Sequence, residues 1–232
     1  MNQNEREHGF YATEDRRNDP KENFKMISHI LKGENGGDWN SLCDIGCASG
    51  DFLYYIREQH GKEKTLVGVD SFDELLHVAK NRVPDCSFLK GDILSGEGLP
   101  TERFDIVCML GVLSLFDDFR LPFENLLKLA APGGNVLVFS PFNSHGCRVE
   151  HRYSVKGGES ERWMVFSQEE IGAWLQEKGY RYEFIPFHLT INLDPDPNNP
   201  LRSYTVALAD GSNGIVDGIG LWHEQYLLKI ST

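Results

Sequence analysis

No stretch of the sequence approaches the ~18 consecutive apolar residues that a membrane-spanning helix needs. The N-terminal stretch 1–14 is polar and mixed in charge, so it has no apolar core for a signal peptide. Cysteine is scarce, and the five cysteines form no paired metal-ligand pattern, although Cys43 and Cys47 lie close together. We therefore expect a soluble, cytoplasmic protein with reduced thiols, no metal site and no membrane partner.

The sequence has fewer basic than acidic residues. The chain has 23 Lys and Arg against 35 Asp and Glu, which gives a formal net charge of −12. Nucleic-acid binding draws on clustered cations, so this balance favours a small-molecule partner over a nucleic acid. A local basic groove remains open because Arg148 and Arg152 are near neighbours. A monomer and a homodimer both remain open.

The length and composition suit one globular domain. The 232 residues are 40% hydrophobic and 25% charged, and they contain no internal repeat. We therefore treat 1–232 as one domain. It begins with an N-terminal cap helix region at 1–33, which is followed by a ligand-binding core at 38–140. The segments 141–166 and 186–220 are expected to form a lid over a substrate.

Strands and helices alternate through the core. Apolar runs at 42–45, 65–70, 86–90, 104–110 and 135–140 predict buried strands, and helical patterns near 51–59, 71–81 and 121–131 lie between them. Asp19 and Pro20 predict the start of the N-terminal helix, and Ser71 with Glu74 predicts a capping box. This alternation predicts a parallel sheet with right-handed crossovers.

The last third follows a different pattern. Ser167 and Glu170 predict a capped helix, and 182–187 has the pattern of a strand. Asp210 and Gly211 lie between two short apolar runs and predict a β-hairpin. A strand predicted at 226–230 closes the chain.

A glycine-rich turn follows the first strand of the core. Gly46 and Gly50 allow a tight backbone path and the close approach of a ligand. Open α/β sheets bind ligands at the carboxyl ends of their strands, where this turn lies. Asp70 ends the next strand, where a carboxylate can accept hydrogen bonds from ribose hydroxyls. These features fit a nicotinamide dinucleotide as well as S-adenosylmethionine.

Asp44 separates these two ligands by charge. It lies just before the turn, where its carboxylate would repel a pyrophosphate and attract the ammonium and sulfonium of S-adenosylmethionine. Asp92 follows the third strand, where it can accept a hydrogen bond from an adenine amine. Asp44, Asp70 and Asp92 together predict an acidic rim around a cleft the size of a nucleoside.

The motifs of the core are, in order, Asp44-Ile45-Gly46-Cys47-Ala48-Ser49-Gly50, Val67-Gly68-Val69-Asp70, Gly91-Asp92, Phe104-Asp105-Ile106-Val107 and Pro132-Gly133-Gly134. In this order and spacing, residues 42–140 resemble the class I S-adenosylmethionine-dependent methyltransferase family. Ala48 departs from the pattern, since the family often has glycine there. The resemblance implies an α/β, Rossmann-like, seven-stranded, mostly parallel sheet with one antiparallel strand. Helices would cover both faces, and a small β-hairpin or lid would be added.

The resemblance also implies a reaction and the residues that hold its cofactor. S-adenosylmethionine would give its methyl group by in-line displacement without a metal, leaving S-adenosylhomocysteine. Asp44 and Gly46 would lie near the methionine part, Asp70 at the ribose, Asp92 with the Ile93 backbone at the adenine, and Leu110 at the sulfonium. The complete expected cofactor set is Asp44, Gly46, Cys47, Ala48, Gly50, Asp70, Ser71, Asp92, Ile93 and Leu110.

The acceptor side has weaker signals. The closing hairpin is similar to small-molecule methyltransferases found with bacterial sugar enzymes, so the expected acceptor is a sugar or related metabolite, methylated on oxygen or nitrogen. His145 is the candidate base for a hydroxyl acceptor. The candidate substrate residues are Tyr11, Arg148, Arg152 and Tyr153. A non-catalytic S-adenosylmethionine-binding protein and an NAD-dependent dehydrogenase remain alternatives. A nucleic-acid methyltransferase would need a basic groove.

Overall fold

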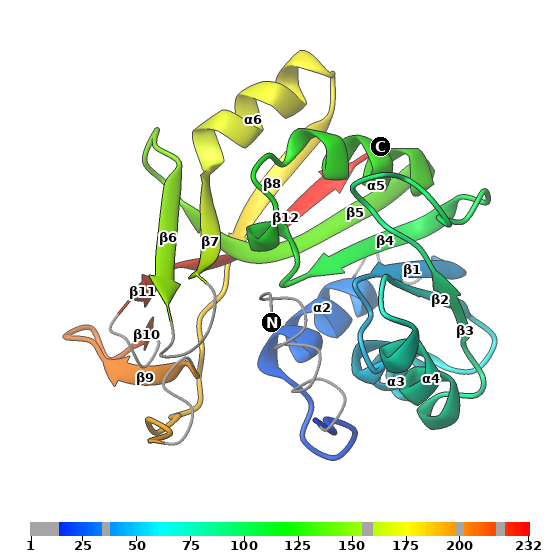
Figure 1. The fold of residues 1–232 in the computed structure, drawn as a ribbon, viewed down its shortest axis with the longest axis horizontal. Coiled ribbons are helices and arrows are strands. Elements are labelled where there is room, and N and C mark those ends of the chain that lie inside the picture. Colours follow the sequence, from blue (N-terminus) through cyan, green and yellow to red (C-terminus); the bar gives the residue numbers. More distant parts are fainter. Residues whose placement is uncertain (1–13, 34–37, 155–159, 198–201, 217–220) are drawn as a thin grey trace.

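The computed structural model describes residues 14–33, 38–154, 160–197, 202–216 and 221–232. Its main sheet contains strands in the order β3-β2-β1-β4-β5-β12-β8 (Figure 1). Their bounds are Ser87–Lys90 for β3, Thr65–Asp70 for β2, Ser41–Ile45 for β1, Phe104–Leu110 for β4, Ala130–Asn143 for β5, Gln225–Ser231 for β12 and Arg181–Pro186 for β8. Neighbours from β3 to β5 are parallel, and β12 is antiparallel to both β5 and β8. The expected Rossmann-like sheet with one antiparallel strand is confirmed.

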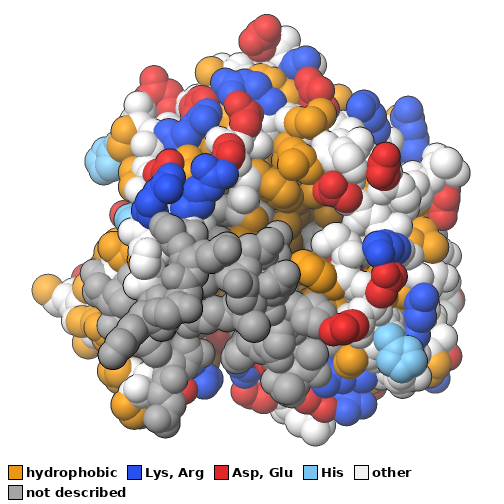
Figure 2. Space-filling view, in the orientation of Figure 1, with side chains coloured by type: hydrophobic (Ala, Val, Ile, Leu, Met, Phe, Trp, Pro, Cys, Tyr) orange, Lys and Arg blue, Asp and Glu red, His pale blue; other side chains and the backbone are white. Residues whose placement is uncertain are grey.

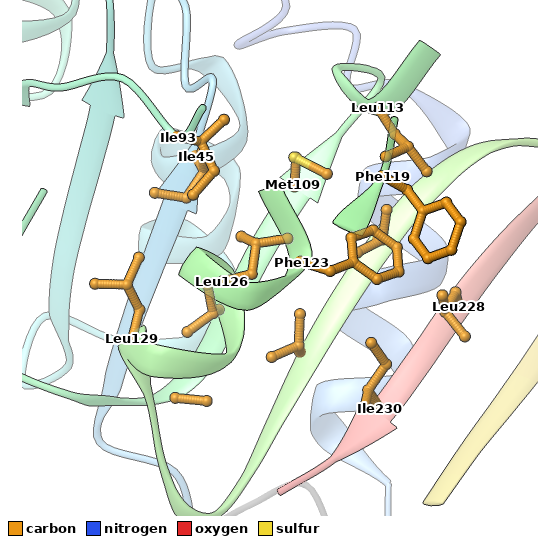
Figure 3. Packing of buried hydrophobic residues seen from close by; sticks show 14 of the residues in the cluster. Ile45, Ile93, Met109, Leu113, Phe119, Phe123, Leu126, Leu129, Leu228 and Ile230 are labelled. Carbon is orange, nitrogen blue, oxygen red and sulfur yellow. The ribbon is translucent and has the colours of Figure 1, made fainter. Parts of the chain in front are cut away.

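Helices cover both faces of this sheet. Their bounds are Glu22–Lys32 for α2, Asp51–His60 for α3, Asp73–Arg82 for α4, Arg120–Leu129 for α5 and Gln168–Glu177 for α6. Side chains of β4 alternate between two cores. Ile106 and Cys108 pack with the side chains of α2, α3 and α4, and Val107 and Met109 pack with those of α5 and α6. Figure 3 shows the second core, where Phe123 and other residues of α5 lie over the sheet. None of the described helices has the length and apolarity needed to cross a membrane.

The order of the strands creates a crevice at one edge. The chain passes from β1 outward to β2 and β3, then returns to β4 on the other side of β1. The connections therefore leave β1 and β4 in opposite directions, and the space between them at the carboxyl ends of the strands stays open. The short helix η1 (Leu113–Leu115) follows β4 at this edge.

Two additions lie beside the carboxyl edge of the sheet. Strands β6 (Val149–Ser154) and β7 (Ser160–Ser167) form an antiparallel hairpin, and β7 also pairs with the end of β5. Strands β9 (Tyr204–Ala207), β10 (Asn213–Val216) and β11 (Trp222–His223) form a separate small sheet. Figure 1 shows this sheet on the same side of the molecule as the β6–β7 hairpin. The hairpin predicted around Asp210 and Gly211 connects β9 and β10.

Two predicted helix caps are wrong and one is confirmed. Helix α2 begins at Glu22 without a side-chain cap, because the N-cap position is held by Lys21 and not by Asp19. The Asp19 carboxylate accepts a hydrogen bond from Arg16 Nη1 at 2.8 Å. Helix α4 begins at Asp73, also without a side-chain cap, so Ser71 and Glu74 form no capping box. Ser167 does cap α6, since its Oγ accepts from the backbone of residues 169 and 170.

Phe119 joins the β6–β7 hairpin to the main core, which leads to a stability prediction. Its ring lies 5.4 Å from Phe123 of α5, 5.6 Å from Phe166 of β7 and 5.8 Å from Trp174 of α6. We expect Phe119→Ala to lower the free energy of unfolding by about 3–5 kcal/mol. The control Leu121→Ala removes an exposed side chain and should stay within about 0.5 kcal/mol of the original. Urea unfolding measures both, and similar midpoints for the two variants would contradict the assignment.

Candidate active site

A pocket of about 1260 Å³ opens at the carboxyl ends of β1, β2 and β4. The last residues of these strands, Ile45, Asp70 and Leu110, all line it. Residues between 14 and 24 line one side, and Tyr153 of β6 and Ile215 of β10 line another. Single-ligand pockets usually measure about 300–1,000 Å³. This pocket therefore has room for a cofactor together with an acceptor.

The turn after β1 is held tightly against its surroundings. Gly46 has a φ of +75°, and a Cβ at this position would clash with the side chain of Val112. The N–H groups of Gly46 and Cys47 both donate to the carbonyl of Val69, at 2.8 and 3.1 Å. Only glycine fits here without displacing Val112, and the turn lies close against the end of β2 as a result.

Ala48 and Asp70 form the next contact of the turn. Ala48 has a φ of +46°, in the left-handed region that costs an L-residue about 1–2 kcal/mol. Its N–H donates to Asp70 Oδ2 at 2.8 Å, and the Phe72 N–H donates to Asp70 Oδ1 at 3.0 Å. The carboxylate at the end of β2 is thereby fixed in direction. The hydrogen bond from the Ala48 N–H therefore links the strained backbone at Ala48 to the position of the Asp70 carboxylate.

The Asp44 side chain is buried, and one of its carboxyl oxygens has no hydrogen-bond partner among the described residues. Asp44 is 2% exposed, and the oxygen concerned is Oδ1. Burial raises the pKa of Asp44 well above its usual value, and the negative charge of Asp70 raises it further. An unpaired buried polar atom is costly, and a cation bound beside Asp44 would remove that cost. The residues therefore fit a ligand that brings an ammonium group into this part of the pocket.

The N-terminal segment adds two groups that the sequence analysis missed. Asn23 lines the pocket, and its Oδ1 is buried without a partner among the described residues. Arg16 also lines the pocket, where its guanidinium contacts Glu14 at 2.7 Å and Asp19 at 2.8 Å. The Asn23 oxygen can accept hydrogen bonds from the ammonium group of an amino acid, and the Arg16 guanidinium can bind its carboxylate. The sequence predicted a helix start and part of a substrate lid in this segment, but it did not single out Asn23 or Arg16.

The loop after β3 also lines the pocket. Asp92 is exposed, and its Oδ1 accepts from the Leu94 N–H at 2.8 Å. Ile93 is 5% exposed, and its carbonyl accepts from Asn125 Nδ2 at 2.8 Å. Helix α5 therefore helps to hold the loop that carries Asp92.

Most of the expected cofactor residues lie together. The lining contains Asp44, Gly46, Cys47, Ala48, Asp70, Ser71, Asp92, Ile93 and Leu110. Gly50 is not among the lining residues. It has a φ of +82° directly before α3, and a Cβ there would press on the Phe88 ring at 3.1 Å and on Ala79 at 3.2 Å. Its role in the structure is close packing of α3 against the sheet.

The expected acceptor-side residues do not gather in the same way. Tyr153 lines the pocket, whereas His145 and Arg152 are exposed and are not among its lining residues. Arg152 pairs with Glu150 at 2.6 Å. Arg148 pairs with Glu170 at 2.6 Å. Tyr11 lies outside the described residues.

One group of lining side chains is apolar. These residues come from β5, from the loop after β8 and from β10, and they are Phe139, Phe187, Leu189, Leu193 and Ile215. Sequence reasoning located the segment 186–220 but not these residues. An apolar side chain that faces a pocket has the same sequence pattern as one that faces a core.

The fold and the site define a class of protein. A glycine turn at the crevice of a parallel sheet, with acidic groups after successive strands, is the architecture of an α/β protein that binds a nucleoside-type ligand. Residues 11–183 match the family described as "Methyltransferase domain", and the chain belongs to that family. The protein is a class I S-adenosylmethionine-dependent methyltransferase.

Known relatives and structures agree with this membership. The dTDP-4-amino-2,3,4,6-tetradeoxy-D-glucose N,N-dimethyltransferase of Saccharopolyspora spinosa is 26% identical over 63% of this chain and 73% of its own length. The trans-aconitate 2-methyltransferase of Rhizobium etli is 31% identical over 43% of this chain and 38% of its own. The glycopeptide N-methyltransferase MtfA, solved with S-adenosylmethionine, has a TM-score of 0.57 at 11% identity, covering 90% of this chain and 92% of that one. This last likeness shows a shared fold.

The left-handed conformation of Ala48 gives a prediction about stability. Ala48→Gly removes the Cβ that opposes this conformation, while the extra freedom of glycine in the unfolded chain offsets part of the gain. We expect the free energy of unfolding to rise by about 0.5–1 kcal/mol. Ala79→Gly, inside α4, is the control and should lower it. Urea unfolding without ligand gives both values, and a less stable Ala48→Gly variant would mean that Ala48 is not strained.

The buried carboxyl of Asp44 gives a pH prediction. Its folded pKa lies above the unfolded value of about 3.9, so between these two values the folded state binds more protons than the unfolded state. The contribution of Asp44 to stability is therefore complete below about pH 3.9 and is lost as the pH rises through the folded pKa. Asp44→Asn, which copies the protonated acid, should flatten this pH dependence. Denaturation midpoints of both proteins across pH measure it, and parallel curves would exclude Asp44 as the source.

Proposed function

We propose that this pocket binds S-adenosylmethionine in its acidic half and transfers the methyl group to an oxygen or nitrogen of a small-molecule acceptor in its apolar half. The observation that supports this most directly is the buried, unpaired carboxylate of Asp44 beside the glycine turn. It suits a ligand with an ammonium group. It would repel the pyrophosphate of a nicotinamide dinucleotide, so the dehydrogenase alternative is disfavoured by charge as well as by family.

Each polar group of the acidic half has a proposed partner on the cofactor. Asp44 and Asn23 accept hydrogen bonds from the ammonium, and Arg16 binds the carboxylate by exchanging one of its present acidic partners. Asp70 accepts from the ribose hydroxyls, because its direction is already fixed by two backbone N–H groups. Asp92 and Ile93 hold the adenine. Cys47, Ala48, Ser71 and Leu110 complete the contact surface.

The protein's main contribution to the reaction is alignment. When bound, S-adenosylmethionine supplies a methyl carbon that the sulfonium has already activated, so an acceptor needs a lone pair directed at it. The apolar walls from β5, β8 and β10 hold the acceptor and exclude water, and Tyr153 and Gln225 provide polar groups that orient it. Positioning of this kind can supply about 7–11 kcal/mol of the barrier.

The acceptor types we propose are an amine nitrogen and a carboxylate oxygen. One relative is named as an amino-sugar N,N-dimethyltransferase and another as a trans-aconitate methyltransferase, and these names support the two types. Both nucleophiles carry a lone pair at neutral pH or after loss of one proton to solvent, so neither depends on a strong base. The exposed position of His145 agrees with this, and we assign it no proton transfer.

Calorimetric titration tests the cofactor assignment. We expect S-adenosylmethionine and S-adenosylhomocysteine to bind, and NAD⁺ not to bind. Asp70→Ala should weaken binding roughly tenfold to a hundredfold, since hydrogen bonds to a charged group contribute about 1.5–3 kcal/mol. The control is Asp73→Ala, an exposed acid at the start of α4 that is not among the lining residues and pairs with Lys90.

Two results of the titration, and one result of a methylation assay, would decide between the alternatives. Binding of NAD⁺ alone would move the protein among the dehydrogenases. Unchanged affinity in a folded Asp70→Ala variant would remove Asp70 from the site. Cofactor binding without any methylation of amines or carboxylates by the full chain would favour the non-catalytic alternative.

A further inference from the structure

A second cavity, of about 420 Å³, adjoins the active-site pocket. Leu94, Leu115 and Phe116 line both spaces, so these side chains form a shared wall. The other lining residues are Asp117, Asp118, Arg120, Leu121 and Arg162. They come from the connection between η1 and α5, from the start of α5 and from β7.

The cavity exposes apolar surface to solvent. Leu94 is 43% exposed and Leu121 is 46% exposed. Figure 2 shows a hollow with hydrophobic side chains on this side of the molecule, and Lys and Arg side chains lie along one of its borders. Exposed apolar side chains that continue the wall of a ligand pocket are a surface that a ligand can cover.

Arg120 and Arg162 line this cavity, and Arg148 shares an acidic partner with Arg120. The Nη2 atoms of Arg120 and Arg148 both donate to Glu170 Oε1, at 3.2 and 2.6 Å. Arg162 pairs with Asp117. Three separate parts of the chain thus bring guanidinium groups together, although the protein as a whole carries a net charge of −12. Guanidinium groups bind carboxylates and phosphates through two parallel hydrogen bonds.

The arginines differ in how firmly they are held. Arg120 contacts two carboxylates, Asp118 at 2.7 Å and Glu170 at 3.2 Å. Arg162 has Asp117, whose side chain is 62% exposed, and Arg162 itself is 45% exposed. Exposed ion pairs contribute about 0–1 kcal/mol, so an incoming anion can replace Asp117 at little cost. Arg162 is therefore the cation most available to a ligand.

We infer that the second cavity is the outer part of the acceptor site, where Arg162, supported by Arg120, binds an anionic group on an acceptor with an apolar body. The anionic group is a carboxylate or a phosphate. The apolar body lies against the wall of Leu94, Leu115 and Phe116, and the reactive atom extends into the main pocket. The inference rests on the proposed function, because it assigns the acceptor of that same site.

Matched probes separate the anionic group from the apolar body. We would titrate 1-naphthyl phosphate, 1-naphthoate and uncharged 1-naphthol by calorimetry into protein saturated with S-adenosylhomocysteine. Both anions should bind more tightly than 1-naphthol. Arg162→Leu should weaken the anions roughly tenfold to a hundredfold and leave 1-naphthol unchanged. The control Arg181→Leu changes an exposed arginine at the start of β8 that lines neither cavity, and all three affinities should stay the same.

Two results would overturn the inference. One is equal binding of 1-naphthol and the two anions. The other is an equal effect of Arg162→Leu and Arg181→Leu. If the anions bind as expected, the tighter of the two identifies phosphate or carboxylate as the group.

A separate measurement distinguishes failure of this inference from failure of the proposed function. S-adenosylhomocysteine binding is measured first in each variant and should be unchanged, because Arg162 does not line the main pocket. If the unsubstituted protein does not bind this compound, the proposed function fails. The probe titrations without it then still decide whether the second cavity selects anions.

Discussion

Two carboxylates of like charge lie at the carboxyl ends of the adjacent strands β1 and β2, and both are almost completely shielded from water. Asp70 is satisfied by the N–H groups of Ala48 and Phe72, whereas Asp44 retains an unpaired oxygen. The glycine turn, the strained Ala48 and the contact with Val112 all serve this arrangement. Sites of this kind give up stability that a more conventional turn would keep, and the loss is tolerated where the ligand restores the balance. In the proposed function, the ammonium of the cofactor does so at Asp44.

The antiparallel strand β12 determines where the proposed acceptor half of the pocket lies. Because it runs against β5 and β8, its first residues stand at the same edge as the last residues of those strands. Gln225 pairs with Pro141 of β5, accepts from the Phe187 N–H and lines the same pocket as Phe139 and Phe187. The parallel half of the sheet contributes loops with acids and glycines to the pocket, where we propose the cofactor binds. The β5-β12-β8 half contributes apolar side chains, where we propose the acceptor binds, so the proposed division of the pocket follows from the topology.

The sequence was most informative where chemistry restricts the residue type. Asp44, Asp70 and Asp92 were found because the three acids taken together with the glycine turn have few structural explanations, although each alone could be a cap or surface residue, and all three line the pocket. Asp19 and Ser71 failed as helix caps because both helices begin later than the motifs indicated, with Lys21 and Phe72 at the N-cap positions. Asn23 gave no signal, since a polar residue in the first turn of a helix is ordinary. The apolar acceptor wall was invisible because periodicity does not distinguish a pocket from a core.

The charged residues of the main pocket and of the second cavity differ in kind. Beyond a Debye length of about 8 Å at physiological salt, the net charge of the chain is largely screened, so nearby groups decide what binds. Asp44, Asp70 and Asp92 line the main pocket, whereas Arg120 and Arg162 line the second cavity together with Asp117 and Asp118. The main pocket repels a negative group on an acceptor, and in the proposed site such a group takes the place of Asp117 beside Arg162. Repulsion at one end and attraction at the other specify a single orientation more sharply than either does alone. A charged acceptor would therefore enter with its anionic group outward and its uncharged or reactive end toward the cofactor.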